Sequence, residues 1–135
     1  MPKVLSMPST AYYRTIYTIR DYPRLKREYE LLKKETGVKA IEYDGMPKGN
    51  NVSNATEDKI IRLVDLESEI NKMQELINTI PADMRDGILN NIYYGNRFPT
   101  NEWGQLVPSL RTWQREKGKF IAIVAHKLNI YKGEI

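Results

Sequence analysis

The sequence predicts an all-α protein, with a helical N-terminal arm and a C-terminal helical bundle that ends in a helix-turn-helix-like arrangement. Three observations support this prediction. Apolar residues recur at steps of three and four along most of the chain, alternation with period two is nowhere sustained, and Pro, Gly and Asn separate the periodic segments. We divide the 135 residues into a basic helical arm at 1–37, a linker at 38–53 and a helical domain at 54–135.

The arm is expected to hold two helical stretches. Ser9 and Thr10 suit the N-cap of the first stretch, because their hydroxyl oxygens can accept from free amides. Pro23 interrupts the apolar pattern, since proline lacks an amide donor and clashes with the preceding turn, and Asp21 suits the cap of the restarted helix. Gly37 suits the end of that helix.

The linker at 38–53 is predicted from its turn formers, which include Asp44-Gly45, Pro47 and Asn50-Asn51. The strongest periodic segment follows, from Asn54 to Thr79. Its apolar seam repeats in a heptad-like pattern, and a single amphipathic helix of this kind is not stable alone. The seam therefore meets either other helices of this chain or a second copy, and it consists of Leu63, Leu66, Ile70, Met73, Ile77 and Ile80.

Three further helices are expected after the seam. Pro81 suits the first turn of one of them, because a proline there loses no intrahelical hydrogen bond. Thr100 suits the cap of a short helix that contains Trp103, and Pro108 ends it. Ser109 then caps a final helix whose apolar residues are Leu110, Trp113, Phe120, Ile121, Val124 and Leu128.

Composition and the lack of known motifs limit the classes of function that we expect. Cysteine is absent, no apolar run of 18 residues exists, and the start has no apolar stretch suited to a secretory signal, so we expect a cytoplasmic protein with no membrane contact. The single histidine, His126, and the dispersed carboxylates match no catalytic, phosphate-binding or metal-binding motif. We therefore expect no enzyme activity, no cofactor and no metal.

The charge points to a binding role. The formal net charge is +4, with ten Lys and Arg against six Asp and Glu in residues 1–49 and six against three in residues 99–135, so both ends are basic. A short helix, a turn and a basic helix follow one another in the order of a helix-turn-helix, whose second helix reads DNA. Donors on such a helix reach base edges and phosphates, and the candidates are Arg111, Thr112, Gln114, Arg115, Lys117 and Lys119.

Three segments resemble phage late-gene transcriptional activators of the RinA and ArpU type, which relate to the fourth region of sigma factors. They are IRDYPRLKREYELLKKE, MPKGNNVSNATEDKIIRLVDLESEI and SLRTWQREKGKFIAIVAHKLNIY. The resemblance places Ser109, Arg111 and Thr112 on the family's Ser-x-Arg-Thr opening of the recognition helix, and Trp103 on the tryptophan of the preceding helix. It implies a phage or prophage regulator that binds double-stranded DNA and contacts RNA polymerase.

Two other classes of function stay open. A phage packaging or assembly adaptor, similar to a small terminase subunit, would use the helices to form a ring. A helical protein-interaction module would bind another protein without touching DNA. The heptad-like seam is more often an internal core than an interface between chains, and self-association as a homo-oligomer stays open.

Overall fold

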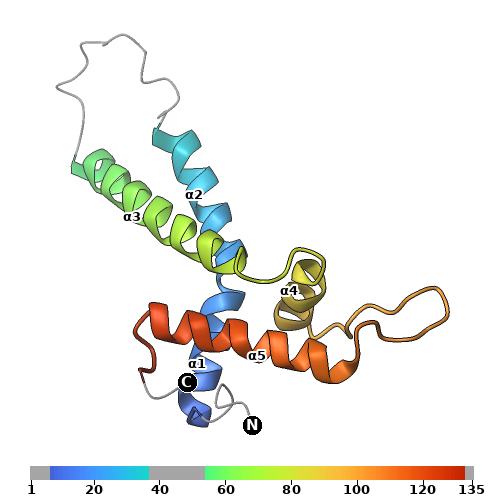
Figure 1. The fold of residues 1–135 in the computed structure, drawn as a ribbon. Coiled ribbons are helices and arrows are strands. Elements are labelled where there is room, and N and C mark those ends of the chain that lie inside the picture. Colours follow the sequence, from blue (N-terminus) through green and yellow to red (C-terminus); the bar gives the residue numbers. More distant parts are fainter. Residues whose placement is uncertain (1–6, 37–53, 133–135) are drawn as a thin grey trace. The chain divides into compact units, whose positions relative to one another are not determined.

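The protein is all-helical over the residues that a computed structural model describes, 7–36 and 54–132, as the sequence predicts (Figure 1). These residues form no strand, and their single β-bridge joins Thr100 to Leu106. None of the described helices is long and apolar enough to cross a membrane. The five helices are α1 (Ser9–Arg20), α2 (Tyr22–Thr36), α3 (Asn54–Ile77), α4 (Arg85–Tyr94) and α5 (Leu110–Lys127).

The chain packs into two compact units. One unit is Tyr22–Lys72, which holds α2 and most of α3; the other joins Met1–Asp21 to Met73–Ile135 and holds α1, α4 and α5. This grouping differs from the predicted division into arm, linker and domain, because α1 packs against α4 and α5 rather than staying with α2. The predicted linker at 38–53 and the predicted helix end at Gly37 lie outside the described residues.

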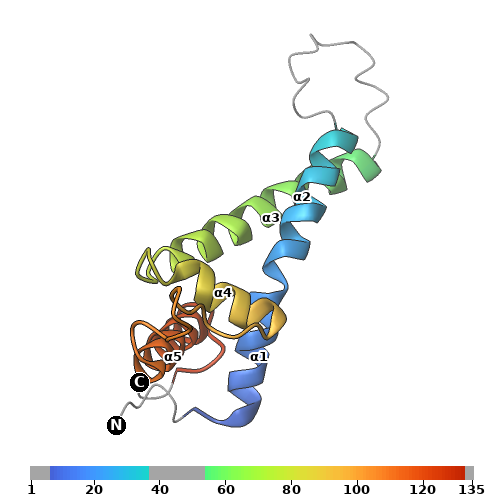
Figure 2. The same ribbon diagram turned by 90° about the vertical axis from the view of Figure 1, so that its right-hand side faces the viewer.

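The α1–α4–α5 unit is built around isoleucine and aromatic side chains. In Figures 1 and 2, α5 crosses beside α1. The end of α1 is tied to α4 by the Arg20 side chain, whose Nε donates to the Ile92 carbonyl oxygen at 2.7 Å. Burying one of the isoleucine or aromatic side chains of this core stabilises the fold by about 1.5–3 kcal/mol. The fully buried residues of this core include Ile19, Ile88, Ile92, Phe120, Ile121 and Val124.

The α2–α3 unit is a pair of antiparallel helices joined by two ion pairs. Glu28 of α2 accepts from Arg62 of α3 at 3.0 Å and 3.1 Å, and Lys59 lies 3.1 Å from Glu35. Leu63 and Leu66 of α3 are buried. The predicted apolar seam is buried within the chain at Leu63, Leu66, Met73, Ile77 and Ile80, and half-buried at Ile70.

The predicted helix breaks and caps agree with the structure only in part. Pro23 does separate two helices, with α1 ending at Arg20 and α2 starting at Tyr22. Asp21 is the C-cap of α1 in right-handed helical backbone. The N-cap of α1 is Pro8, with no side-chain cap, so the cap predicted at Ser9 or Thr10 is wrong.

The start of α4 also differs from the prediction. Pro81 opens a turn, in which the Met84 amide donates to the Pro81 carbonyl oxygen at 2.9 Å, and the helix begins only at Arg85. The Thr79 hydroxyl donates back to the Leu76 carbonyl oxygen at 2.6 Å, so it does not cap α4. A side chain that bonds the end of the preceding helix is not available to cap the next one.

The predicted short helix at Trp103 is wrong, and the helix-turn-helix arrangement is not confirmed. Residues 100–106 form a hairpin-like loop closed by the Thr100–Leu106 bridge. The Asn101 side-chain oxygen accepts from the amides of Trp103 and Gln105, both at 2.9 Å. Gly104 adopts a φ of 75°, which glycine tolerates and a helix does not contain. Local side-chain hydrogen bonds of this kind compete with helix formation.

Candidate nucleic-acid interface

The N-terminus of α5 is capped as the sequence predicts. Ser109 is the N-cap, and its hydroxyl oxygen accepts from the Thr112 amide at 3.3 Å. The Ser109 and Thr112 hydroxyls lie 3.2 Å apart. The first turn contains no acidic residue, so the positive end of the helix dipole is not neutralised there. This end of α5 is therefore favourable for an anion.

Three predicted contact residues share one side of α5. Arg111, Arg115 and Lys119 follow at intervals of four, and each is exposed. Four residues advance about 6 Å along a helix and 40° around it, so the three cations follow a gently turning line along the surface. We call Arg111, Arg115 and Lys119 the cationic stripe. Trp113, Phe120 and Val124 occupy the buried side of the same helix.

The carboxylate of Glu116 reduces the positive charge of the cationic stripe. This carboxylate lies 3.5 Å from the Lys119 ammonium and 3.9 Å from Arg115 Nε. Arg115 and Lys119 are about half exposed and Glu116 is 14% exposed, but both distances are long for an ion pair, so each contact is weak. Both cations can therefore turn from Glu116 to a phosphate at small cost.

Lys117 lies away from the stripe. Residues two apart in a helix point about 200° apart around its axis, so Lys117 lies on the opposite side of α5 from Arg115. It is half-buried, and burial lowers the pKa of its ammonium from the usual 10.5, with a further lowering by the charge of Arg20. Gln114 is exposed at the edge of the stripe, and Thr112 is half-buried beside it. Five of the six predicted residues are thus grouped on or beside one side, and Lys117 is not.

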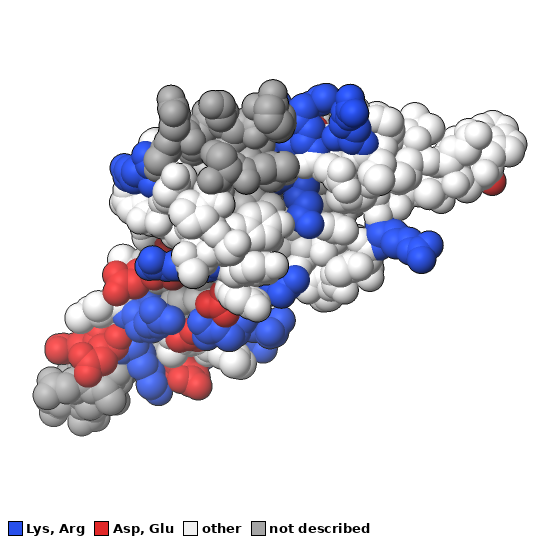
Figure 3. All heavy atoms as spheres, turned by 90° about the horizontal axis from the view of Figure 1, so that it is seen from below, with Lys and Arg blue, Asp and Glu red and all other residues white. Residues whose placement is uncertain are grey.

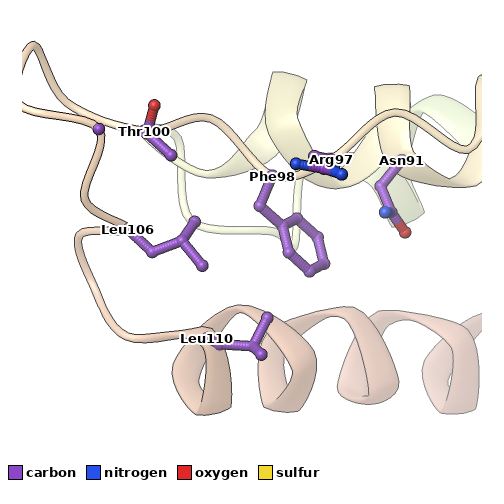
Figure 4. A pocket seen from close by; sticks show the side chains of 7 residues that line it. Asn91, Arg97, Phe98, Thr100, Leu106 and Leu110 are labelled. Carbon is purple, nitrogen blue, oxygen red and sulfur yellow. The ribbon is translucent and has the colours of Figure 1, made fainter.

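A hollow of about 410 Å³ lies beside the start of α5 (Figure 4). The side chains of Phe98, Leu106 and Leu110 turn toward one another there. Arg97 also lines the hollow, so this exposed cation lies near the first turn of α5. The sequence prediction missed Arg97 because it is isolated in a loop, and only the return of the chain through the hairpin brings it to the helix start.

The hairpin itself carries little charge. In Figure 3 it projects at the right and is white except for acidic atoms near its end. Glu102 is the one charged residue of the sequence between 98 and 110. Trp103 beside it is 74% exposed, and Val107 and Leu110 are exposed as well. The exposed surface of the hairpin is therefore mainly apolar, with one negative charge.

The histidine and the carboxylates of the described residues are dispersed over the structure. No group of three or more His, Asp or Glu in that part of the chain is placed to hold a metal ion. His126 is exposed at the end of α5. The predictions of no enzyme activity and no cofactor stay predictions.

Fold and surface together define an all-helical protein whose last described helix presents a cationic side. No family model, no curated protein and no solved structure matches the chain.

Proposed function

We propose that the protein is a DNA-binding transcriptional regulator of the phage late-gene activator type, which contacts duplex DNA through the N-terminal half of α5. The observation that carries the proposal is the outward position of Arg111, Arg115 and Lys119 on one side of a helix whose other side is buried. A helix packed with its cations inward could not reach DNA. The assignment to this type of regulator rests on the resemblance of the three sequence segments described above.

The geometry of the stripe suits a DNA groove. An α-helix with its side chains is about 10–12 Å across, and the stripe from Arg111 to Lys119 runs about 12 Å along its axis. The major groove of B-DNA is about 12 Å wide and admits one α-helix. In this arrangement Arg111 and Gln114, near the helix start, reach base edges. Arg115, Lys119 and the hydroxyl of Thr112 hold phosphates, and Lys117 takes no part.

The proposal is tested by fluorescence anisotropy with a labelled 20-base-pair duplex. We expect binding that weakens steeply between about 50 mM and 200 mM salt, since each phosphate contact releases counterions. The double substitution Arg111→Ala, Arg115→Ala should lower the affinity at least tenfold, because each removes a charge-assisted contact. The control Arg14→Ala, Lys127→Ala removes the same charge from exposed positions outside the stripe. Equal affinity in the stripe variant and the control contradicts the assigned surface.

A second candidate function, protein interaction, is favoured by the hairpin. Trp103 is held at its end by the hydrogen bonds of Asn101, and the apolar hollow lies at its base. A protein-interaction module would use this surface alone, whereas the late-gene activator would use it to contact RNA polymerase in addition to DNA. Both candidate functions therefore assign the hairpin a contact with another protein.

Binding to purified RNA polymerase separates the two candidates. In the activator, Trp103→Ala lowers the affinity for polymerase and leaves the affinity for duplex DNA unchanged. In the interaction module, DNA affinity is negligible at low salt even for the unchanged chain. A packaging adaptor would instead assemble as a large closed ring, which sedimentation detects directly.

A further inference from the structure

Helix α3 presents apolar residues on two sides. Leu63 and Leu66 are buried on one side, while Ile61 is 60% exposed and Val64 58% exposed on the other, with Ile60 exposed beside them. At about 100° per residue, Ile60, Ile61 and Val64 group within about 100°; Ile61 and Val64 lie at least about 100° from both buried leucines, and Ile60 lies at the edge, about 60° from Leu63. We call these three residues the outer stripe.

An outer stripe of this kind is unusual in a helix with only one covered side. Surface helices normally carry one apolar face, and a helix that is apolar all round is covered all round. The α2–α3 unit contains two described helices, and the part of this unit that the structure describes holds no third helix beside the outer stripe. The pattern therefore indicates a partner on this side of α3.

Helix α2 has a surface that the outer stripe fits. A shallow, mainly apolar hollow of about 520 Å³ lies on this helix and is lined by Pro23, Lys26, Arg27, Glu30 and Leu31. Leu31 is 60% exposed there, and the stems of Lys26 and Arg27 form part of the wall. Long basic side chains commonly cover apolar surface with their stems while the charges stay in water. The hollow is thus apolar in its floor, and its rim carries two cations, Lys26 and Arg27, against one carboxylate, Glu30.

Charge makes the two surfaces complementary. Residues 22–36 of α2 contain five Lys and Arg against three Asp and Glu, and residues 57–72 of α3 contain three against five; Glu28–Arg62 and Glu35–Lys59 pair within the chain, and the charges that line the hollow and flank the outer stripe are not among these pairs. Acidic residues lie on or beside the outer stripe, whereas Lys26 and Arg27 line the hollow on α2. Complementary charges on two apolar surfaces favour their association and set its register. The acidic residues are Glu57, Asp58, Asp65 and Glu67.

We propose that two copies of this chain associate through their α2–α3 units, with the outer stripe of each copy in the α2 hollow of the other. A twofold axis forms both contacts at once, because the outer stripe of each copy then meets the α2 hollow of the other copy. The interface is distinct from the buried seam of Leu63 and Leu66. It also goes beyond DNA binding, since the dimer would present two copies of α5 to two half-sites.

Sedimentation equilibrium of the full chain without DNA tests the dimer. We expect twice the mass of one chain at high concentration and dissociation on dilution. Val64→Asp should raise the dissociation constant at least tenfold, because it places a charge in an apolar contact. The matched control Asn90→Asp adds the same charge at an exposed position on α4. Circular dichroism checks that both variants keep their helical content.

Charge reversal tests the register. Arg27→Glu and Asp65→Arg should each weaken self-association at least tenfold, because each places like charges together at both contacts. An equimolar mixture of the two variants should dimerise like the unchanged chain, since each contact then joins opposite charges. The double variant should also regain the dimer.

Several outcomes overturn the proposal. One is a single-chain mass at every concentration, which would mean that the stripe is covered within the chain. Another is a dimer that Val64→Asp leaves as tight as the control does. A third is a mixture of charge variants that associates no better than either alone. Because no DNA is present, these results are independent of the proposed DNA binding.

Discussion

The indole of Trp113 in α5 lies directly against the backbone of Gly87 in α4, with no side chain at position 87 to separate them. A Cβ at Gly87 would lie 2.9 Å from the Trp113 ring and 2.7 Å from Pro99 Cδ. The Phe98 ring stacks on the Trp113 ring, and the two ring centroids are 5.1 Å apart. The contact sets the position of the N-terminal half of α5, and hence of the cationic stripe, against the rest of its unit.

Gly87→Ala should therefore destabilise the protein. Overpacking a close contact costs about 1–3 kcal/mol, which exceeds the gain of about 1 kcal/mol that alanine brings over glycine inside a helix. We expect a lower urea midpoint with an unchanged slope. Asn90→Ala, at an exposed position of the same helix, should change stability by less than about 0.5 kcal/mol. An unchanged or raised midpoint for Gly87→Ala would show that Trp113 moves aside without cost.

Lys117 and Lys119 are two residues apart in sequence and should differ in their effect on DNA binding. Lys119→Ala is expected to weaken binding to every duplex and to reduce the salt slope by about 1, the effect of one lost phosphate contact. Lys117→Ala should leave both quantities nearly unchanged, because its side chain is half-buried on the other side of α5. Equal losses from the two variants would contradict the cationic stripe as the contact surface.

Glu28 should make stability depend on pH in the acidic range. The hydrogen bonds from Arg62, assisted by the charges of Arg62 and Arg24, hold the pKa of the Glu28 carboxyl below its usual 4.5. A carboxyl whose pKa is lowered on folding stabilises the protein above the unfolded-state pKa and loses that contribution as the pH falls through the folded-state value. The partly exposed pair contributes about 1 kcal/mol at most.

The comparison of Glu28→Gln with the unchanged chain measures this contribution. Unfolding in urea at pH 7 should show the variant less stable, and the difference should shrink at pH 3. Glu30→Gln, an exposed neighbour on α2, serves as the control. A difference of the same size at both pH values would mean that Glu28 acts through packing and not through its charge.

Asn101 should control the order of the hairpin without affecting the core. Asn101→Ala removes the side-chain oxygen that accepts from the Trp103 and Gln105 amides. We expect faster hydrogen exchange at these two amides by at least tenfold, with a change in global stability below about 1 kcal/mol because the hairpin is exposed. Asn101→Asp keeps the acceptor and should retain slow exchange. Unchanged exchange in the alanine variant would show that the Thr100–Leu106 bridge alone holds the loop.

The helical class, the break at Pro23, the seam on α3 and the Ser109 cap of α5 could all be predicted without the structure, because each depends on local spacing or on the chemistry of a few neighbouring residues. The prediction from sequence failed at Trp103, where the Asn101 side chain and the positive φ of Gly104 favour a hairpin over the helix that periodicity predicts. Three features follow from the tertiary structure alone: α1 packs with α4 and α5, Arg97 returns to the start of α5, and Lys117 is half-buried near the charge of Arg20. These features depend on which buried faces meet across long separations, and a pattern within one segment carries no information about its partner.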